Sequence, residues 1–364
     1  MIAARGTARA AAVFGVVRVM STLPRDRLRE PSMPAPQNVS PNLPDAPGSA
    51  TACARSLELR FAFIGGARKS GTTWLLKMLA AHPQLLAMGE GFFVGTSGWG
   101  LSPALDERVF RNWAALDDVA RSWMQGVSPQ EGLRVARRGM TEALMRAAAA
   151  RSGKRGFRVL IDKSAYAYSR FAGGLHELFP DASFVDIVRD GRDAAVSDVF
   201  MILAKGLGTH FPEDNHGHIA RAREFHVEGK GEPVPLFNEW LLRRSAREWA
   251  EAVAGSAVGR ECFGPRFIQF RYEELLRDPS IVRRALRMLR VDDSDAAVEV
   301  CVAAGKFQKL SGGREPGQED RGNFFRKGVA GDWRNHFRDE DKRVFKEEAG
   351  RTLIELGYES SENW

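Results

Sequence analysis

A glycine-rich junction at residues 65–74 constrains the fold of this 364-residue chain more than any other feature. Before it, residues 60–66 form an apolar run that predicts a buried strand, and after it residues 72–81 repeat leucines at helical spacing. Glycines at such a junction let the backbone approach a ligand closely, and the start of the helix offers free N–H groups to an anion. Further donors come from the side chains of Lys69, Ser70, Thr72 and Thr73. We therefore predict an anion-binding loop here.

Short apolar segments alternate with helical segments along the rest of the chain. We expect further strands at residues 158–161, 183–188 and 266–270. We expect helices at residues 170–179, 193–204 and 238–253. This alternation is typical of a parallel sheet with helices on both faces. The predicted fold class is therefore α/β, a P-loop-like three-layer fold with a central parallel sheet flanked by helices.

The first 56 residues differ in amino-acid composition from the rest of the chain. They hold seven of the 17 prolines and seven arginines but no lysine, which predicts a disordered or linker-like tail. Residues 57–364 are expected to form one folded domain. Within it, residues 205–235 are rich in Gly, His and Pro, and we interpret them as an exposed insertion or lid.

Composition excludes several classes of function. Outside the tail the chain carries 46 Lys and Arg against 43 Asp and Glu, so bulk charge does not support nucleic-acid binding. No apolar run reaches the roughly 18–20 residues that a membrane span needs. The three cysteines lie far apart without a CxxC pair, so we expect no disulfide framework and no metal site. This pattern fits a reducing compartment, and we predict a cytoplasmic location.

The junction departs from the loop of nucleotide triphosphatases and kinases. That loop is GxxxxGK[ST], with its lysine against the β and γ phosphates. Gly66 and Gly71 have the correct spacing, but Thr72 stands in the lysine position and the lysine is Lys69 instead. This difference argues against a kinase, which we keep as the alternative.

The hexapeptide 69–74, Lys-Ser-Gly-Thr-Thr-Trp, resembles the 5′-phosphosulfate loop of sulfotransferases that use 3′-phosphoadenosine 5′-phosphosulfate (PAPS). The resemblance implies that Lys69 contacts the 5′-phosphate and the bridging oxygen of the leaving group. It implies that the 5′-phosphate is cradled by Ser70, Gly71, Thr72 and Thr73. It also implies that Trp74 stacks on the adenine.

A second motif follows the predicted strand 183–188. Arg189 and Ser197 are eight positions apart, the spacing of the 3′-phosphate site in the same family. Because ligands of open α/β sheets bind at the carboxyl ends of strands, this motif and the first loop face one crevice. Arg192 is either a further base in that site or the partner of Asp190 or Asp193.

A third motif lies near the C-terminus. Residues 325–337 resemble the RKGxxGDWxNHF segment of cytosolic-type sulfotransferases. The resemblance implies that Arg326, Lys327 and Gly328 close over the 3′-phosphate, while the following residues fix the segment to the body. Tyr272 occupies the position of a family tyrosine near the adenine, although a packing role is equally consistent with its surroundings.

Transfer to a hydroxyl also needs a general base. Residues 161–165 lack the histidine of cytosolic-type enzymes and resemble carbohydrate-type and bacterial members, which use a glutamate after the first helix. By that resemblance Glu90 is the base and Lys163 contacts the transferring sulfuryl group. The alternatives for the base are Asp162 and the histidines of the insertion, His210, His216, His218 and His226.

The motifs together predict a PAPS-dependent sulfotransferase that releases adenosine 3′,5′-bisphosphate and requires no metal. Its acceptor would be a hydroxyl, less readily an amine, of a small-molecule, carbohydrate or lipid-like compound. Two alternatives remain, a nucleotide or small-molecule kinase and a non-catalytic nucleotide-binding protein. Neither the acceptor nor the oligomeric state follows from the sequence.

Overall fold

The computed structural model describes residues 59–91, 93–94, 129–205 and 211–364. Two sequence predictions fall on other residues, namely the disordered tail and the candidate base His210. Both therefore lie outside the described part of the chain and stay predictions.

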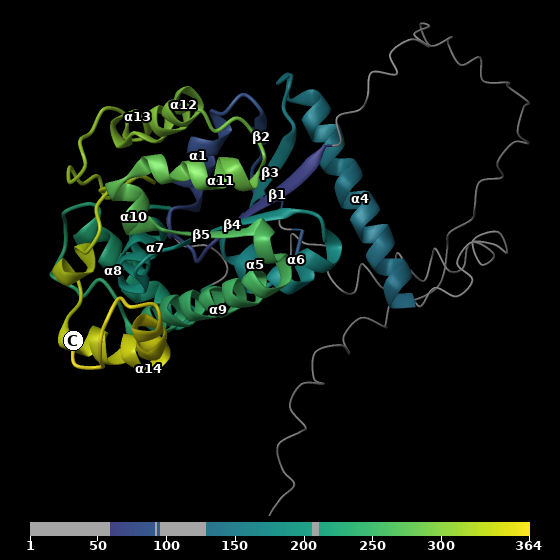
Figure 1. The fold of residues 1–364 in the computed structure, drawn as a ribbon. Coiled ribbons are helices and arrows are strands. Elements are labelled where there is room, and N and C mark those ends of the chain that lie inside the picture. The colour runs from purple at the N-terminus through teal and green to yellow at the C-terminus, as the bar shows by residue number, and fades with distance from the viewer. Residues whose placement is uncertain (1–58, 92, 95–128, 206–210) are drawn as a thin grey trace, which may run out of the picture. The chain divides into compact units, whose positions relative to one another are not determined.

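A five-stranded sheet forms the centre of the fold (Figure 1). Its strands run in the order β2-β3-β1-β4-β5, and every pair of neighbours is parallel. Their bounds are β1 Arg60–Gly65, β2 Leu85–Ala87, β3 Val159–Lys163, β4 Ser183–Val188 and β5 Phe267–Arg271. The prediction of a parallel sheet is confirmed, and so are all four predicted strands.

The register brings the candidate segments to one edge of the sheet. In β1, Ile64 pairs with Lys163 of β3, and Gly65 pairs with Asp186 of β4. The carboxyl ends of these three strands therefore coincide, and the loops that follow them share one side of the fold.

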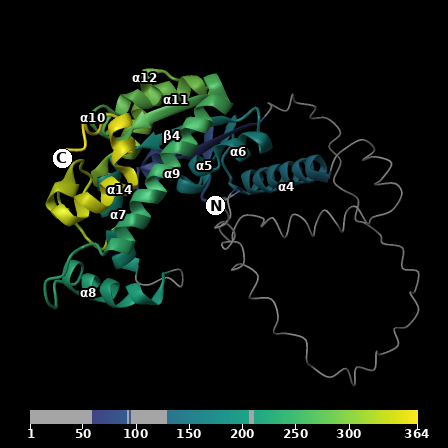
Figure 2. The same cartoon turned by 90° about the horizontal axis from the view of Figure 1, so that it is seen from below.

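Helices cover both faces of the sheet, which confirms the three-layer prediction (Figure 1). One face carries α1 Thr72–Ala80, α10 Tyr272–Arg277, α11 Arg283–Met288 and α12 Asp295–Gly305. The opposite face carries α5 Ala165–Arg170, α6 Ala172–Leu178 and α9 Glu239–Phe263. Against α9 pack α7 Gly191–Lys205 and α14 Asp339–Glu355, which Figure 2 shows beside it. The other α-helices within the described residues are α4 Pro129–Arg151, α8 His216–His226 and α13 Phe307–Ser311.

Three local predictions differ from the structure. Strand β2 was missed because three residues are too few for an alternation to show. The predicted helix 170–179 is two helices, since Phe171 leaves helical geometry with φ −111° and ψ 33°. The predicted helix 238–253 begins as expected, where the Asn238 side chain accepts a hydrogen bond from Leu241 N, but continues to Phe263.

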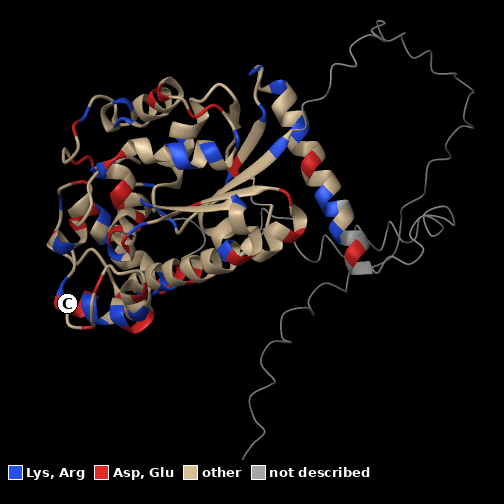
Figure 3. Cartoon of the chain, viewed as in Figure 1, with Lys and Arg blue, Asp and Glu red and all other residues tan. Residues whose placement is uncertain are grey.

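The predicted insertion contains an ordered helix. In α8, Ile219 and Ala222 are buried and join the core formed with α7 and α9. The segment is thus anchored to the body along this helix. Among the described helices none combines the length and apolarity needed to cross a membrane. Lys and Arg residues are interspersed with Asp and Glu residues along the described elements, as the near balance of charge outside the tail predicts (Figure 3).

Candidate functional site

The loop between β1 and α1 has an unusual backbone. Gly66 and Gly71 adopt φ angles of 144° and 103°, and Lys69 lies in the left-handed region at 63°. A Cβ atom on Gly66 would overlap the carbonyl oxygen of Ile187, so only glycine lets the loop pass the end of β4. Gly71 occupies the N-cap position of α1. The loop thus curls around the start of a helix, as an anion cradle requires.

Lys69 lies at this cradle without a carboxylate partner among the described residues. Its Nζ atom is 3.5 Å from the Met201 sulfur and 3.9 Å from the centroid of the Phe324 ring. Burial lowers the pKa of Lys69 to about 8, although the charge of Asp198 acts in the opposite direction. A cation held without a counter-ion favours an anionic ligand or leaving group.

Arg189 follows β4 directly and connects the first and third predicted motifs. Its guanidinium donates hydrogen bonds to Lys69 O at 3.3 Å and to Val329 O at 3.0 Å. It also forms an ion pair with Asp193 at 3.7 Å and lies 4.4 Å from the centroid of the Tyr272 ring. Segments that are more than 100 residues apart in sequence therefore meet at one side chain.

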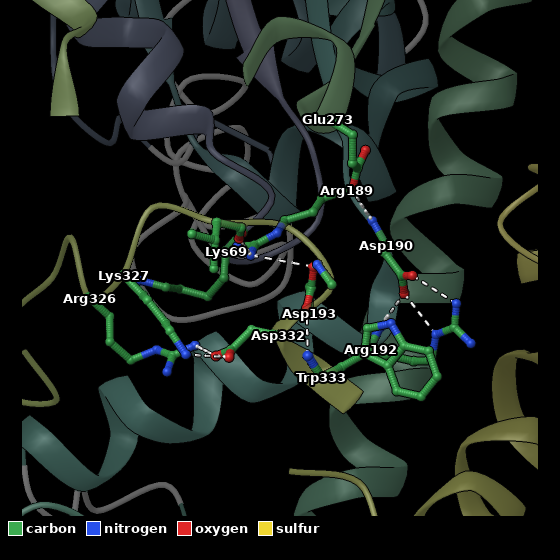
Figure 4. A network of polar contacts seen from close by, with 12 residues as sticks. Lys69, Arg189, Asp190, Arg192, Asp193, Glu273, Arg326, Lys327, Asp332 and Trp333 are labelled. Carbon is green, nitrogen blue, oxygen red and sulfur yellow. Dashed lines mark hydrogen bonds and ion pairs between the residues drawn. The ribbon is translucent and has the colours of Figure 1, made fainter. Parts of the chain in front are cut away.

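Arg192 does not belong to this cluster. Its guanidinium pairs with Asp190 at 2.8 Å and with Glu359, and it stacks on Trp333 at 3.8 Å from the ring centroid. Figure 4 shows it directed toward Trp333. Of the interpretations left open by the sequence, pairing with Asp190 is the one that the structure shows.

The start of α7 holds the third motif in place. The Asp193 carboxylate accepts hydrogen bonds from Gly331 N at 2.6 Å and from Trp333 N at 2.9 Å. Trp333 is buried, as expected for a residue that fixes the segment to the body. The third motif is thus attached to the helix that begins at the second motif.

Two cations of the third motif share one carboxylate (Figure 4). Arg326 and Lys327 contact the two oxygens of Asp332 at 2.5 and 2.6 Å. Burial alone would raise the pKa of Asp332, but hydrogen bonds from His336, Lys327 and other neighbours hold it well below its usual range. The cations are therefore oriented in advance, next to the backbone that Arg189 contacts.

Each predicted motif contains a buried polar atom without a hydrogen-bond partner in the described structure. These atoms include Ser70 Oγ, Arg189 Nε and Arg326 Nε, and the third motif adds Trp333 Nε1 and His336 Nε2. Buried polar groups are rarely left unpaired, and those in native structures commonly serve a ligand or a catalytic role. Their donors and the surrounding cations fit a ligand with several anionic oxygens.

The remaining predicted donor-site residues lie around the same cluster. Thr72 and Thr73 form the first turn of α1. The Trp74 and Tyr272 rings meet edge to face at 5.4 Å, and Trp74 Nε1 donates to Gly305 O. Ser197 is the first residue of α7 that is not fully buried. Gly328 has a φ of 68° and lies against the Phe307 ring.

The candidate base Glu90 contacts the predicted partner Lys163. Lys163 ends β3 with only 5% of its surface exposed, and its Nζ atom forms an ion pair with the Glu90 carboxylate. The Glu90 side chain is 48% exposed, so solvent or a substrate can reach it. Burial raises the pKa of the neighbouring Asp162 to about 6, and its carboxylate accepts hydrogen bonds from Tyr168 and Gly91.

The described histidines of the insertion, His216, His218 and His226, all belong to helix α8. His216 and His226 each place Nε2 within hydrogen-bond distance of a backbone oxygen, at 3.1 and 2.8 Å. The Nε2 atom of His218 is buried without a partner. His82 is fully buried at the end of α1, where its ring bonds to Asp292 O, consistent with a structural role.

Two residues near the cations were not singled out from the sequence, and a third, Asp193, was considered only as a partner of Arg192. Met201 and Phe324 contact Lys69, and Asp193 holds the third motif. Met201 lies four residues after Ser197, so helical spacing could have indicated it. Nothing in the local sequence distinguishes Asp193 as a tether, because its partners lie more than 130 residues away.

Comparisons with known proteins found one family model and several similar solved structures. Residues 62–228 match a family model described as the sulfotransferase family, and no curated protein matches the chain. Similar solved structures include mouse sulfotransferase SULT7A1 complexed with PAP, at 17% identity over 82% of this chain and 89% of that one, with a TM-score of 0.43. Another is the sulfotransferase domain of the Synechococcus PCC 7002 olefin synthase, at 19% identity over 80% and 94%, with a TM-score of 0.42. A third is sulfotransferase STF9 from Mycobacterium avium, at 13% identity over 82% and 77%, with a TM-score of 0.43.

Proposed function

We propose that this chain is a member of the sulfotransferase family, whose model its residues 62–228 match, and that it transfers a sulfuryl group from PAPS to an acceptor hydroxyl. The observation that supports the proposal most is the meeting of three sequence motifs at Arg189. A doubly phosphorylated adenosine needs two separate groups of donors, one for each phosphate. The loop 66–71 supplies one group, and Arg189 with the segment 326–328 supplies the other.

Lys69 acts on the leaving group in this proposal. Sulfuryl transfer breaks the bond between sulfur and the bridging oxygen, so negative charge accumulates on the departing bisphosphate. An ammonium already fixed beside that oxygen stabilises the charge without reorganisation. The buried Ser70 hydroxyl and the backbone of Gly71, Thr72 and Thr73 bind the 5′-phosphate at the helix N-terminus.

The second group of donors binds the 3′-phosphate. Arg189 and Arg326 each keep a buried Nε atom free of any described partner, and Lys327 lies next to Arg326. In this proposal Ser197 of α7 also binds the 3′-phosphate, while Trp74 and Tyr272 contact the adenine. Charge-assisted hydrogen bonds from several cations suit a phosphate group.

Glu90 accepts the proton of the acceptor hydroxyl. Its carboxylate is accessible and contacts Lys163, which in turn would bind an oxygen of the moving sulfuryl group. Glu90 is favoured over Asp162 because Asp162 is 2% exposed and engaged by two donors. The acceptor is a small-molecule, carbohydrate or lipid-like alcohol or phenol.

A binding experiment separates this function from the kinase alternative. We expect calorimetry to show binding of adenosine 3′,5′-bisphosphate without metal and much weaker binding of ATP with Mg²⁺, because the kinase lysine is replaced by Thr72. Preference for ATP with Mg²⁺ would contradict the proposal.

A transfer experiment separates it from a non-catalytic binding protein. The purified protein is incubated with sulfur-labelled PAPS and a panel of phenols, sugars and lipid alcohols, and products are read by the mass gain of one sulfuryl group. We expect label in at least one acceptor, and loss of that label in Lys69→Ala. Absence of both labelled product and released bisphosphate with every acceptor would leave only a binding function.

A further inference from the structure

We infer that Asp162 is a positioning residue that holds Glu90 against Lys163 by fixing the backbone of Gly91, an inference that rests on the proposed role of Glu90 as base. Asp162 and Lys163 are consecutive in β3, so their side chains leave the strand on opposite faces. One residue therefore faces the candidate base, and its neighbour faces the loop that carries the base. Strand β3 thus positions both members of the ion pair: it contains Lys163, and through Asp162 it holds the loop that carries Glu90.

The loop that carries Glu90 is attached to β3 at two points. Met88 N donates to Ile161 O at 2.8 Å, and Gly91 N donates to Asp162 Oδ2 at 3.2 Å. Glu90 lies between these two anchors, in a stretch without helix or strand. The side-chain anchor is the one adjacent to Glu90, so its loss would release the base while leaving the Met88 anchor in place.

Gly91 is suited to this close approach. A Cβ atom at this position would lie 2.5 Å from the Phe93 ring and 3.0 Å from Asp162 Oδ2. Any side chain at residue 91 would therefore push the loop away from Asp162. The requirement for glycine directly after the base follows from the same contact.

Asp162 is itself held firmly by the core. Its carboxylate is 2% exposed and accepts a hydrogen bond from the hydroxyl of Tyr168, a fully buried residue on α5. The Tyr168 ring packs edge to face on Phe63 of β1, at 5.3 Å between centroids. The anchor of the Glu90 loop is thus part of the rigid centre of the fold.

A double-mutant cycle tests the inference. We expect Asp162→Ala to lower kcat by about 10²-fold, the effect of misplacing a reacting group by roughly 1 Å, with unchanged affinity for adenosine 3′,5′-bisphosphate. In a Glu90→Gln background the same change should cause no further loss. Asp162→Asn should recover most of the activity, because an amide oxygen still accepts the Gly91 N–H, whereas a base could not be replaced by Asn.

A matched control removes a different buried carboxylate. Asp186 on β4, which β1 separates from β3, accepts hydrogen bonds from Ser169, Ser256 and Gln269 and makes no described contact with residues 88–91. Asp186→Asn should lower the melting temperature but leave kcat of the folded enzyme near the wild-type value. Hydrogen exchange at the Gly91 amide should accelerate in Asp162→Ala and not in Asp186→Asn.

Each failure has a distinct signature. A wild type that transfers no sulfuryl group refutes the proposed function, whereas unchanged exchange at Gly91 in Asp162→Ala refutes the anchoring. If the wild type is active and Glu90→Gln is not, wild-type kcat in Asp162→Ala overturns this inference alone. An equal loss in the Glu90→Gln background would show that Asp162 acts independently of Glu90.

Discussion

At the level of single residues, Lys69 differs from the other cations of the site in its electrostatic environment. Lys69 has no carboxylate partner among the described residues, although most other cations near it do, and it lies against a methionine and an aromatic ring. An uncompensated buried cation is costly to the fold. A ligand that brings negative charge removes this cost. The positive charge of Lys69 therefore lowers the stability of the free protein while it serves the proposed reaction.

Replacement of this lysine should abolish most of the transfer activity. Lys69→Ala is expected to lower kcat by about 10²-fold or more, because the departing oxygen loses a fixed positive charge. Lys309, on the surface helix α13, serves as the control position for loss of a lysine. Steady-state rates with PAPS measure kcat for both variants. Near-normal turnover in Lys69→Ala would exclude Lys69 from the leaving-group site.

The lowered pKa of Lys69 predicts a pH dependence with a definite sign. With a pKa of about 8, the ammonium is present below that pH and is lost as the pH rises through it. Since kcat/KM reports ionisations of the free enzyme, kcat/KM for PAPS should fall above about pH 8. In Lys69→Arg the side chain stays charged, so the alkaline decline should disappear. A decline that persists unchanged in Lys69→Arg would assign it to another group.

At the scale of elements, the site depends on junctions at the ends of strands. The loop after β1 and the start of α7 after β4 meet because β1 and β4 are parallel and adjacent, and the segment 326–333 joins them through Arg189 and Asp193. Gly66 lets the first junction pass Ile187, and Asp193 joins the second to the third. Substitutions at Gly66 and Asp193 should therefore disturb the site by moving the backbone segments that carry its side chains.

Alanine at Gly66 tests the first junction. We expect Gly66→Ala to lower the free energy of unfolding by roughly 1–3 kcal/mol, since the new methyl group is strained at φ 144° and meets the Ile187 carbonyl. Gly174→Ala in α6 is the control, because nothing lies within 4 Å of the added carbon. Urea unfolding of both variants gives the comparison. Equal stability of the two would show that the loop can shift freely.

Loss of the Asp193 carboxylate tests the second junction. Asp193→Ala removes two backbone hydrogen bonds and the ion pair with Arg189, so the third motif should loosen. We expect the affinity for adenosine 3′,5′-bisphosphate to fall about tenfold, equivalent to roughly 1.4 kcal/mol. Asp339→Asn, at an exposed position, should bind like the wild type. Unchanged calorimetric affinity in Asp193→Ala would mean that the third motif does not contribute to binding.

At the scale of the whole molecule, the proposed ligand would bridge distant parts of the chain. Lys69 lies near the start of the described fold and the segment 326–329 near its end, and Arg189 from the middle donates hydrogen bonds to Lys69 O and to Val329 O. A ligand held by all three should therefore stabilise the domain as a unit. The sheet links the binding segments to one another, because its adjacent strands β1 and β4 lead directly into two of the three.

Thermal unfolding measures this coupling directly. At a bisphosphate concentration of 100 times Kd, the free energy of unfolding should rise by about 2.7 kcal/mol through mass action. Calorimetric scans should show one transition that moves upward with ligand, while equimolar ATP moves it much less. A ligand-dependent shift confined to part of a split transition would contradict binding across the domain.

The sequence alone determined the four main strands, the α/β class and the three motifs, because each is encoded by neighbouring residues with a local periodicity or spacing. It also placed the glycines of the first junction. Only the tertiary structure decided that Arg192 pairs with Asp190, that Asp332 orients two cations, and that Glu90 meets Lys163. Those outcomes depend on burial and on contacts between residues far apart in the chain, which no local pattern records.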